Sequence, residues 1–224
     1  MRPTEPTAAP FAALLLDIGN VIIDINWAAV EAFETATGTN VRGPFTGDAD
    51  DELWQQRAAG ALAADDYWRH VAEQAGYDST PAMARAMAAV VADRMLDEGA
   101  VALMSDALTA GKQVGVLSND AYDFLGRDFF AGRPEFAALH AFVDASELGS
   151  RKPAAAAYRH AADALGVEPN RVVYLDDTPE MVDGAVAVGM TAIHVDTLNR
   201  RPAFVLAREL LGLELPGLEP GRTS

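Results

Sequence analysis

Short apolar runs alternate with longer segments of helical pattern along most of the chain. The runs that predict buried strands cover residues 11–16, 113–117, 142–143, 172–175 and 191–195. The spacing of apolar positions predicts helices over residues 98–110, 121–130, 153–165, 179–188 and 202–212. Continuous apolar strands that alternate with helices are typical of a parallel sheet with both faces covered. The pattern therefore predicts an α/β fold with a Rossmann-like parallel sheet.

The part of the chain between the first run and the second has a different pattern. Alanine-rich segments of helical spacing, separated by glycine and proline, cover residues 27–37, 50–59, 64–75 and 81–95. No strand is predicted among them. We therefore expect an all-helical insertion, residues 26–97, in a core domain formed by residues 1–25 and 98–224. Four aromatic residues are expected in the core of this insertion, with one or two facing a site: Trp27, Trp54, Tyr67 and Trp68.

Composition narrows the class of protein. The chain has 224 residues, of which 50% are hydrophobic and 22% charged, a balance typical of globular proteins rather than disordered or collagen-like ones. It carries 33 acidic against 17 basic residues, which gives a formal charge of −16. Such a chain repels nucleic acid and anionic lipid, so neither nucleic acid nor a membrane is expected as a partner.

The absence of cysteine bears on the cellular compartment. It excludes disulfides, thiolate metal sites and cysteine nucleophiles, and it fits a reducing cytoplasm. The run at 11–16 is short and ends at Asp17, so we interpret it as a buried strand rather than a signal peptide. No run approaches the roughly 20 apolar residues of a membrane span. We predict a cytoplasmic protein, and the sequence indicates no oligomeric state.

Polar side chains stand where three of the predicted strands end, at Asp17, Ser118, Asn119, Asp176 and Asp177. In open α/β sheets, ligands bind beyond the carboxyl ends of the strands. Lys152, one of two lysines in the chain, directly precedes the helix predicted at 153. Carboxylates suit Mg²⁺, and a serine hydroxyl and a lysine ammonium suit the oxygens of a phosphate. A carboxylate can also act as a nucleophile and form an aspartyl-phosphate.

Each of these residues also has a purely structural interpretation. An aspartate or serine after a strand is commonly a turn or N-cap residue, and Asp176 and Asp177 can cap the helix that follows them. Lys152 before a proline can be an ordinary surface residue. Their joint placement at one edge of one sheet is what favours a phosphate site. The four histidines have no metal-ligand spacing and are interpreted as surface or core residues: His70, His140, His160 and His194.

The sequence resembles the haloacid dehalogenase superfamily, in the branch with an all-helical cap inserted after the first motif. Four segments carry the resemblance over about residues 11–200, in the family order: Leu-Leu-Leu-Asp17-Ile-Gly-Asn-Val-Ile, Val-Leu-Ser118-Asn119, Gly-Ser-Arg-Lys152-Pro and Val-Val-Tyr-Leu-Asp176-Asp177-Thr-Pro-Glu. The first segment is similar to that of a group that includes bacterial α-glucose-1-phosphate phosphatases. The insertion at 26–97 corresponds to the cap in this resemblance.

The resemblance implies a Mg²⁺-dependent phosphatase that hydrolyses a small phosphomonoester of the sugar-phosphate type through an aspartyl-phosphate. The partner implied is therefore a small-molecule phosphate. In the matching positions, Asp17 is the nucleophile and a metal ligand, and Lys152 balances the charge of nucleophile and phosphate. Ser118 and Asn119 bind the phosphoryl group, together with backbone N–H groups that follow Asp17.

Further positions follow the family pattern in part. The Asp177 carboxylate and the Gly19 carbonyl are implied as metal ligands, with Asp176 as a ligand or an outer partner. At the position of Gly19, most phosphatases of the family have an aspartate that acts as general acid and base. Met181 stands where Asp or Asn is common. Asp24 lies where the family has a mobile flap, and it is expected as a substitute acid or substrate contact, or as a solvated turn carboxylate.

Two other functions stay open. A 2-haloacid dehalogenase shares the fold and the nucleophile but needs no metal, and the carboxylates of Asp176 and Asp177 would then serve no cation. A catalytically weak binding or regulatory protein of this fold would account for Gly19 and Met181. Two further functions are disfavoured. A phosphomutase would need the acid that Gly19 lacks. A two-component receiver domain has its paired acids after the first strand, whereas Asp176 and Asp177 come late in this chain.

Overall fold

The chain divides into two compact units. The structure is a computed structural model that describes residues 11–23, 27–38, 52–53, 56, 61–91 and 96–214. The first unit comprises Met1–Asp24, Leu96–Asp120 and Phe130–Ser224, and the second comprises Ile25–Met95 and Ala121–Phe129. Residues 121–129, which the sequence analysis assigns to the core domain, thus group with the second unit. The division into a core domain and a cap at residues 26–97 stays a prediction.

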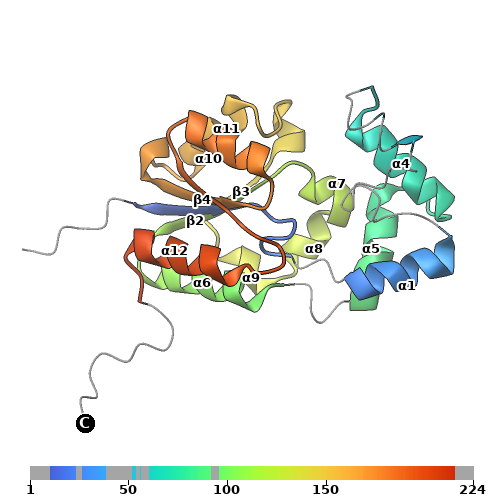
Figure 1. The fold of residues 1–224 in the computed structure, drawn as a ribbon, viewed down its shortest axis with the longest axis horizontal. Helices are drawn as coiled ribbons and strands as arrows, with labels where there is room; N and C mark the ends of the chain where they lie inside the picture. The colour runs from blue at the N-terminus through green and yellow to red at the C-terminus, as the bar shows by residue number, and fades with distance from the viewer. Residues whose placement is uncertain are drawn as a thin grey trace, which may run out of the picture. The chain divides into compact units, whose positions relative to one another are not determined.

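The first unit is built on a five-stranded parallel sheet (Figure 1). Its order is β3-β2-β1-β4-β5, and its strands are β1 (Ala13–Leu16), β2 (Gln113–Ser118), β3 (Ala141–Asp144), β4 (Val172–Asp176) and β5 (Thr191–His194). β1 and β4 are buried along their whole length, which is why they appear in the sequence as continuous apolar runs. This sheet confirms the predicted α/β fold.

The strand order brings distant parts of the chain to one edge of the sheet. β1 lies between β2 and β4, so the direction in which the sheet grows reverses at β1. Leu16 of β1 stands level with Val116 of β2 and Leu175 of β4. The residues after these positions therefore emerge side by side at the carboxyl edge.

Helices cover both faces of this sheet (Figure 1). One face carries α10 (Ala155–Ala164) and α11 (Pro179–Ala187), and the other carries α6 (Glu98–Thr109) and α12 (Arg201–Leu211). Buried alanines on α10 allow this helix to approach the strands closely. Shorter helical elements are α8 (Arg127–Ala131), α9 (Pro134–Ala137), η1 (Ala145–Leu148) and η2 (Pro169–Arg171).

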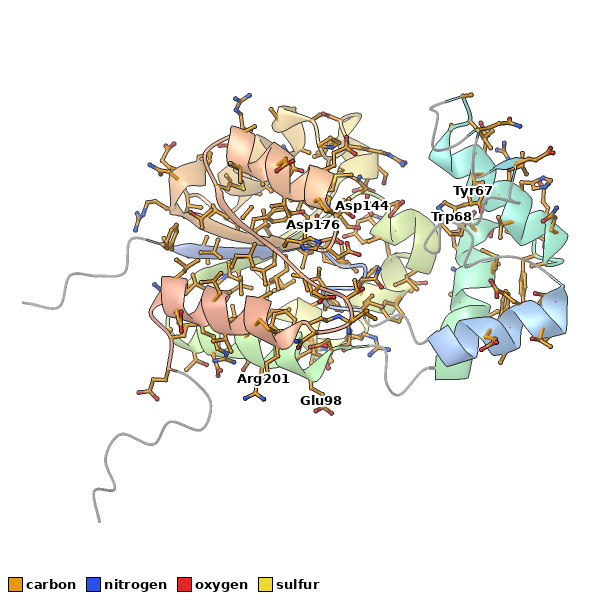
Figure 2. All side chains as sticks on the ribbon, in the orientation of Figure 1. Tyr67, Trp68, Glu98, Asp144, Asp176 and Arg201 are labelled. Atoms are coloured by element: carbon orange, nitrogen blue, oxygen red, sulfur yellow. The ribbon has the colours of Figure 1, made fainter. Side chains whose placement is uncertain are left out.

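The second unit is helical in its described residues, with α1 (Trp27–Thr37), α4 (Ala64–Gln74), α5 (Thr80–Val91) and α7 (Ala121–Leu125). Its core contains Tyr67, and Trp68 packs against this core half-buried (Figure 2). The expected core position is confirmed for Tyr67. The side chain of Trp27, the whole of Trp54 and most of the helix predicted at 50–59 lie outside the described residues.

Two predicted helices differ from those observed. The helix expected over 121–130 is divided into α7 and α8 at Gly126, whose φ of +80° is left-handed and interrupts a helix. The helix expected from 153 begins at Ala155. Pro153 lies instead in a turn in which the N–H of Ala154 donates to the carbonyl of Arg151 over 2.9 Å. Within the described part of the chain, no helix combines the length and the apolar character that crossing a membrane requires.

Candidate active site

The polar residues that the sequence analysis singled out meet at the carboxyl edge of the sheet. Asp17 directly follows β1, and Ser118 and Asp176 are the last residues of β2 and β4. The N–H of Asp17 donates to the carbonyl of Leu175 over 2.8 Å, which holds Asp17 beside the end of β4. Figure 2 shows Asp176 at this edge. Parallel pairing of three neighbouring strands thus assembles the site.

Lys152 lies at the centre of a buried hydrogen-bond network. Its ammonium nitrogen Nζ is 2.7 Å from Asp17 Oδ1, 2.8 Å from Asp176 Oδ2 and 2.9 Å from Tyr174 Oη. The Lys152 side chain is only 3% exposed. Burial lowers the pKa of Lys152, but the carboxylates of Asp17 and Asp176 more than offset this, and its pKa ends above the usual range. The ammonium is therefore a permanent positive charge in the site.

Both carboxylate oxygens of Asp176 accept hydrogen bonds from the protein. Oδ2 accepts from Lys152 and from the hydroxyl of Tyr174, and Oδ1 accepts from the N–H of Thr178 over 2.9 Å. The residue is 1% exposed. Asp176 is thus anchored on every side, and it also orients the first turn of α11 through Thr178.

Asp177 is held less tightly and lies closer to solvent. Its Oδ2 accepts from the side-chain amide of Asn20 over 3.0 Å, and its Oδ1 accepts from the Thr178 hydroxyl over 3.3 Å. Burial raises the pKa of Asp177, and the hydrogen bond from Asn20 opposes that rise. Its backbone carbonyl lies 2.9 Å from Nε2 of His194. The side chain therefore faces the β1 segment.

Asp17 has one oxygen bound and one available. Oδ1 accepts from Lys152, while Oδ2 has no hydrogen-bond partner among the residues described. Burial raises the pKa of Asp17 to about 7; the charge of Lys152 lowers it, and the neighbouring carboxylates of Asp176 and Asp177 raise it further. An added cation would relieve this crowding of negative charge.

The donor set fits a hard divalent cation. One carboxylate oxygen from each of Asp17, Asp176 and Asp177 lies within 4.8 Å of the others, and no further group of this kind occurs in the described ranges. When all three carboxylates are ionised, they outnumber the one ammonium, that of Lys152, in this group of described residues by two charges. Carboxylate oxygens are ligands that Mg²⁺ prefers. A dication of this type would match both the chemistry and the charge of the site.

The residues at the end of β2 serve partly to place Lys152. The side-chain oxygen of Asn119 accepts from the N–H of Lys152 over 2.7 Å, and its amide donates to the carbonyl of Lys152 over 3.1 Å. This pair of bonds fastens the Lys152 segment to β2. Ser118 is 5% exposed, and its Oγ accepts from the N–H of Asp120 over 3.5 Å. The Ser118 hydroxyl donates to no residue that the structure describes, so its proton is available for a ligand.

Gly19 lies in a tight turn that follows Asp17. The carbonyl of Ile18 accepts from the N–H groups of Ile22 and Ile23, over 3.1 and 2.8 Å. A Cβ atom on Gly19 would lie 3.8 Å from Asp17 Oδ2, an ordinary contact, so the absence of a side chain here is not imposed by crowding. Asp24, also predicted to be part of the site, lies outside the described residues.

Several residues at the site were not predicted, among them Thr178, which bonds to Asp176 and Asp177. Tyr174 lies two positions before Asp176 and shares its face of β4, so the two-residue repeat of a strand was a usable signal. Asn20 lies three positions after Asp17 with a left-handed φ of 55°, which Asn tolerates better than most residues. Arg200 donates from Nε to the carbonyl of Asn20 over 2.7 Å, and no local pattern indicates this contact.

Solved structures of other proteins share this fold. A dehalogenase structure aligns with a TM-score of 0.58 at 19% identity and covers 83% of this chain and 85% of its own. A HAD family enzyme from Bacteroides thetaiotaomicron, solved with magnesium and inorganic phosphate, aligns with a TM-score of 0.56 at 16% identity and covers 84% of this chain and 95% of its own. At these identities the likeness shows the fold alone.

Comparisons of sequence identify the family as well as the fold. Phosphatase MT3486 of Mycobacterium tuberculosis (strain CDC 1551 / Oshkosh) is 34% identical over 122 residues, which are 52% of this chain and 54% of the relative. The chain thus spans about half the length of this curated relative. A family profile described as haloacid dehalogenase-like hydrolase matches residues 11–189, a range that holds all four motif segments. The chain therefore belongs to the haloacid dehalogenase-like hydrolase family.

Proposed function

We propose that this protein is a Mg²⁺-dependent phosphatase that hydrolyses a small phosphomonoester of the sugar-phosphate type through a phosphorylated Asp17. The observation that carries the proposal is the arrangement of the Asp17 carboxylate. Lys152 holds Oδ1 at 2.7 Å, and Oδ2 accepts no hydrogen bond from the described residues. A carboxylate fixed by one oxygen presents the other in a defined direction, as a nucleophile requires. A relative named as a phosphatase supports the same reaction class.

Two displacements at phosphorus make up the proposed reaction. In the first, Asp17 Oδ2 forms a bond to phosphorus while the bond from phosphorus to the leaving oxygen breaks. The leaving oxygen takes its proton from water, because Gly19 has no side chain to supply one. In the second, a water oxygen bonds to phosphorus, its proton passes to solvent, and the bond between Asp17 and phosphorus breaks. The products are the alcohol and inorganic phosphate.

The remaining residues bind and orient the phosphoryl group in this proposal. Asp17, Asp177 and the Gly19 carbonyl would hold Mg²⁺, which when bound neutralises charge on the phosphoryl oxygens. Asp176 is assigned as an outer partner, because three donors hold its buried carboxylate and one of them is the Lys152 ammonium at 2.8 Å. Asp177 accepts only longer bonds from neutral donors, over 3.0 and 3.3 Å. Ser118 donates its hydroxyl to a phosphoryl oxygen.

Asn119 contributes through its backbone N–H, since its side chain is bound to Lys152. Backbone N–H groups in the segment after Asp17 complete the phosphate site. Residues 26–97 act as a cap that excludes water during the reaction. The location remains a prediction of a cytoplasmic protein and rests on the absence of cysteine.

A screen of phosphate release tests the proposal. Sugar phosphates, nucleotides and aryl phosphates are each incubated with the protein in Mg²⁺ and in excess EDTA. We expect release of inorganic phosphate in Mg²⁺ alone, with small sugar phosphates and aryl phosphates turned over best. No release from any ester in Mg²⁺ would contradict the proposal and favour a binding or regulatory role.

A dehalogenase is the second candidate, because a dehalogenase structure shares the fold. In that reaction the Asp17 carboxylate displaces halide from carbon and needs no cation. The carboxylates of Asp176 and Asp177 close to Asp17 disfavour the dehalogenase reaction, since without a cation they would only repel an anionic haloacid. Chloride release from 2-chloropropionate in EDTA, with no phosphatase activity in Mg²⁺, would establish the dehalogenase instead.

A further inference from the structure

Tyr174 stands inside the site network although its ring belongs to the core. The residue is 0% exposed and packs with Leu15, Leu117 and Tyr158 in the apolar layer between the sheet and α10. Its hydroxyl reaches the edge where the carboxylates meet. There it donates to Asp176 Oδ2 and lies 2.9 Å from Lys152 Nζ. An apolar ring thus carries one polar atom directly into the charged network.

The donors of Lys152 are fully used by protein oxygens. An ammonium has three N–H groups, and three acceptors surround this one: Asp17 Oδ1, Asp176 Oδ2 and Tyr174 Oη. Lys152 therefore has no N–H left for a substrate oxygen unless one of these bonds breaks. Its effect on a phosphate passes through Asp17.

The Tyr174 hydroxyl is both a donor and an acceptor in this network. Its proton goes to Asp176, so its oxygen lone pairs are free to accept from Lys152. Without that oxygen, one N–H of a buried ammonium would lack an acceptor. A buried donor without a partner is unfavourable, so the ammonium would turn toward water or toward the substrate.

We propose that Tyr174 is a positioning residue: its hydroxyl takes up the third N–H of Lys152 and so holds the ammonium on Asp17 Oδ1, leaving Oδ2 as the attacking oxygen. The part of this inference that concerns the reaction rests on the proposed phosphatase function. The part that concerns the ammonium of Lys152 does not, and it can be tested without substrate or metal.

The chain offers a matched control in Tyr158. Both tyrosines are 0% exposed, and their rings pack edge to face with centroids 5.7 Å apart. The Tyr158 hydroxyl donates to the carbonyl of Met181 over 2.7 Å and makes no hydrogen bond to Lys152 within the described part of the chain. Tyr158→Phe and Tyr174→Phe therefore each remove a tyrosine hydroxyl from the same core layer, but only Tyr174→Phe removes a hydrogen bond to Lys152.

The first measurement observes the ammonium directly. The chain has two lysines, Lys112 and Lys152, so ¹⁵N-lysine labelling gives two side-chain signals, which Lys112→Arg assigns. In metal-free protein we expect the Lys152 ammonium protons to exchange slowly with water. Tyr174→Phe should shift this signal and speed the exchange of its protons by about tenfold or more, because one N–H loses its acceptor. A tenfold change in the exchange rate corresponds to about 1.4 kcal/mol. The Lys112 signal should stay unchanged, and Tyr158→Phe should alter neither.

The second measurement separates orientation from binding. With p-nitrophenyl phosphate and Mg²⁺, Tyr174→Phe should lower kcat by about 10- to 100-fold, because a misplacement of about 1 Å can cost about 10²-fold. KM should stay within about twofold, since no substrate contact is removed. Tyr158→Phe should keep both constants near those of the wild-type protein.

The two measurements have distinct outcomes. A Lys152 signal that Tyr174→Phe leaves unchanged overturns the proposal, whatever the kinetics. A shifted Lys152 signal with an unchanged kcat in Tyr174→Phe overturns the proposed role of Tyr174 in the reaction. If the wild-type protein releases no phosphate at all, the phosphatase proposal fails, while the ammonium signal still decides whether Tyr174 holds Lys152.

Discussion

At the scale of single residues, Asp17 differs from the neighbouring Asp176 in how much of its carboxylate is already hydrogen-bonded within the described part of the chain. Asp176 has both oxygens bonded within the protein and is 1% exposed. Asp17 has one oxygen bonded and is 9% exposed. Identical side chains can thus take different roles because the surrounding donors differ. The carboxylate with a free oxygen is the one expected to do chemistry.

Replacing Asp17 by Asn tests this assignment. The amide keeps the shape of the side chain but is a poor nucleophile, so we expect phosphate release to fall by at least about 10³-fold. The fold should be retained, because Lys152 keeps its bonds to Asp176 and Tyr174. Phosphate release and circular dichroism measure the two effects. Asp183→Asn, an exposed aspartate on α11, is the control and should remain active.

Activity of Asp17→Asn above a few per cent of the wild type, in a preparation free of contaminating phosphatase, would reject Asp17 as the nucleophile. Loss of the circular dichroism signal would instead indicate a structural role of the carboxylate.

Gly19 leads to a prediction about the leaving group. Without an acid at this position the leaving oxygen departs with little help, and such help is typically worth about 10²–10⁴-fold. An anomeric hydroxyl is more acidic than a primary one and suffers less from this loss. We therefore expect glucose 1-phosphate and p-nitrophenyl phosphate to be hydrolysed much faster than glucose 6-phosphate. Initial rates of phosphate release at equal concentrations measure the difference.

Gly19→Asp should narrow that difference by raising the rate on glucose 6-phosphate. The backbone leaves room for a side chain, since a Cβ would be 3.8 Å from Asp17 Oδ2. Gly19→Ala is the matched control, because it adds the Cβ without the acid. Equal wild-type rates on the two sugar phosphates would contradict the argument and point to a substitute acid such as Asp24.

At the scale of elements, the turn after β1 is tied to two segments far along the chain. The side chain of Asn20 donates to Asp177 after β4, and its carbonyl accepts from Arg200 before α12. Arg200 Nη1 also lies 3.8 Å from Asp97 Oδ2, at the start of α6. Arg200 therefore connects the turn that contains Gly19 to the start of α6, and we call this connection the Arg200 brace.

Removing this brace should weaken metal binding. Arg200→Met frees the carbonyl of Asn20 and loosens its hold on Asp177, and loss of such outer contacts typically costs about 10- to 100-fold in metal affinity. We expect the Mg²⁺ concentration for half-maximal activity to rise by about tenfold or more. Arg201→Met is the control, since Arg201 is exposed and points away from the sheet (Figure 2). Similar Mg²⁺ requirements in both variants would show that the brace does not act on the metal site.

At the scale of the whole molecule, a net charge of −16 opposes an anionic substrate. The field of such a chain lowers the local concentration of phosphate esters. The site itself holds three carboxylates and one ammonium, so it attracts a cation before it can accept a phosphate dianion. In the proposed phosphatase, a bound cation would therefore be the main local source of positive charge for the substrate.

Chelation tests this dependence. Excess EDTA should abolish phosphate release, and added Mg²⁺ should restore it, because the dianion would otherwise meet uncompensated carboxylates. The measurement is a time course before and after chelation, with Mg²⁺–EDTA added to a second sample to control for the chelator. Full phosphatase activity in EDTA would contradict a metal-dependent mechanism.

The hydrophobic pattern predicted the strands and the longer helices of the first unit, but not the short elements α9, η1 and η2. The strands at 172–175 and 113–117 were predicted within a residue of β4 and β2, because a buried parallel strand is apolar over its whole length. The helices at 98–110 and 179–188 were equally close to α6 and α11. The pattern was insufficient where a single residue takes a left-handed backbone conformation. Gly126 is such a residue, and it divides the helix predicted over 121–130.

The local sequence also determined which residue types stand at the strand ends and before α10, and hence the candidates Asp17, Asp177 and Lys152. Only the tertiary structure decided how they are bonded. Strand order and register bring Tyr174 onto Lys152 and turn the side chain of Asn119 to the Lys152 backbone, and they set Arg200 on Asn20. Periodicity is a property of neighbouring residues, whereas a hydrogen bond across the sheet depends on which strands lie side by side.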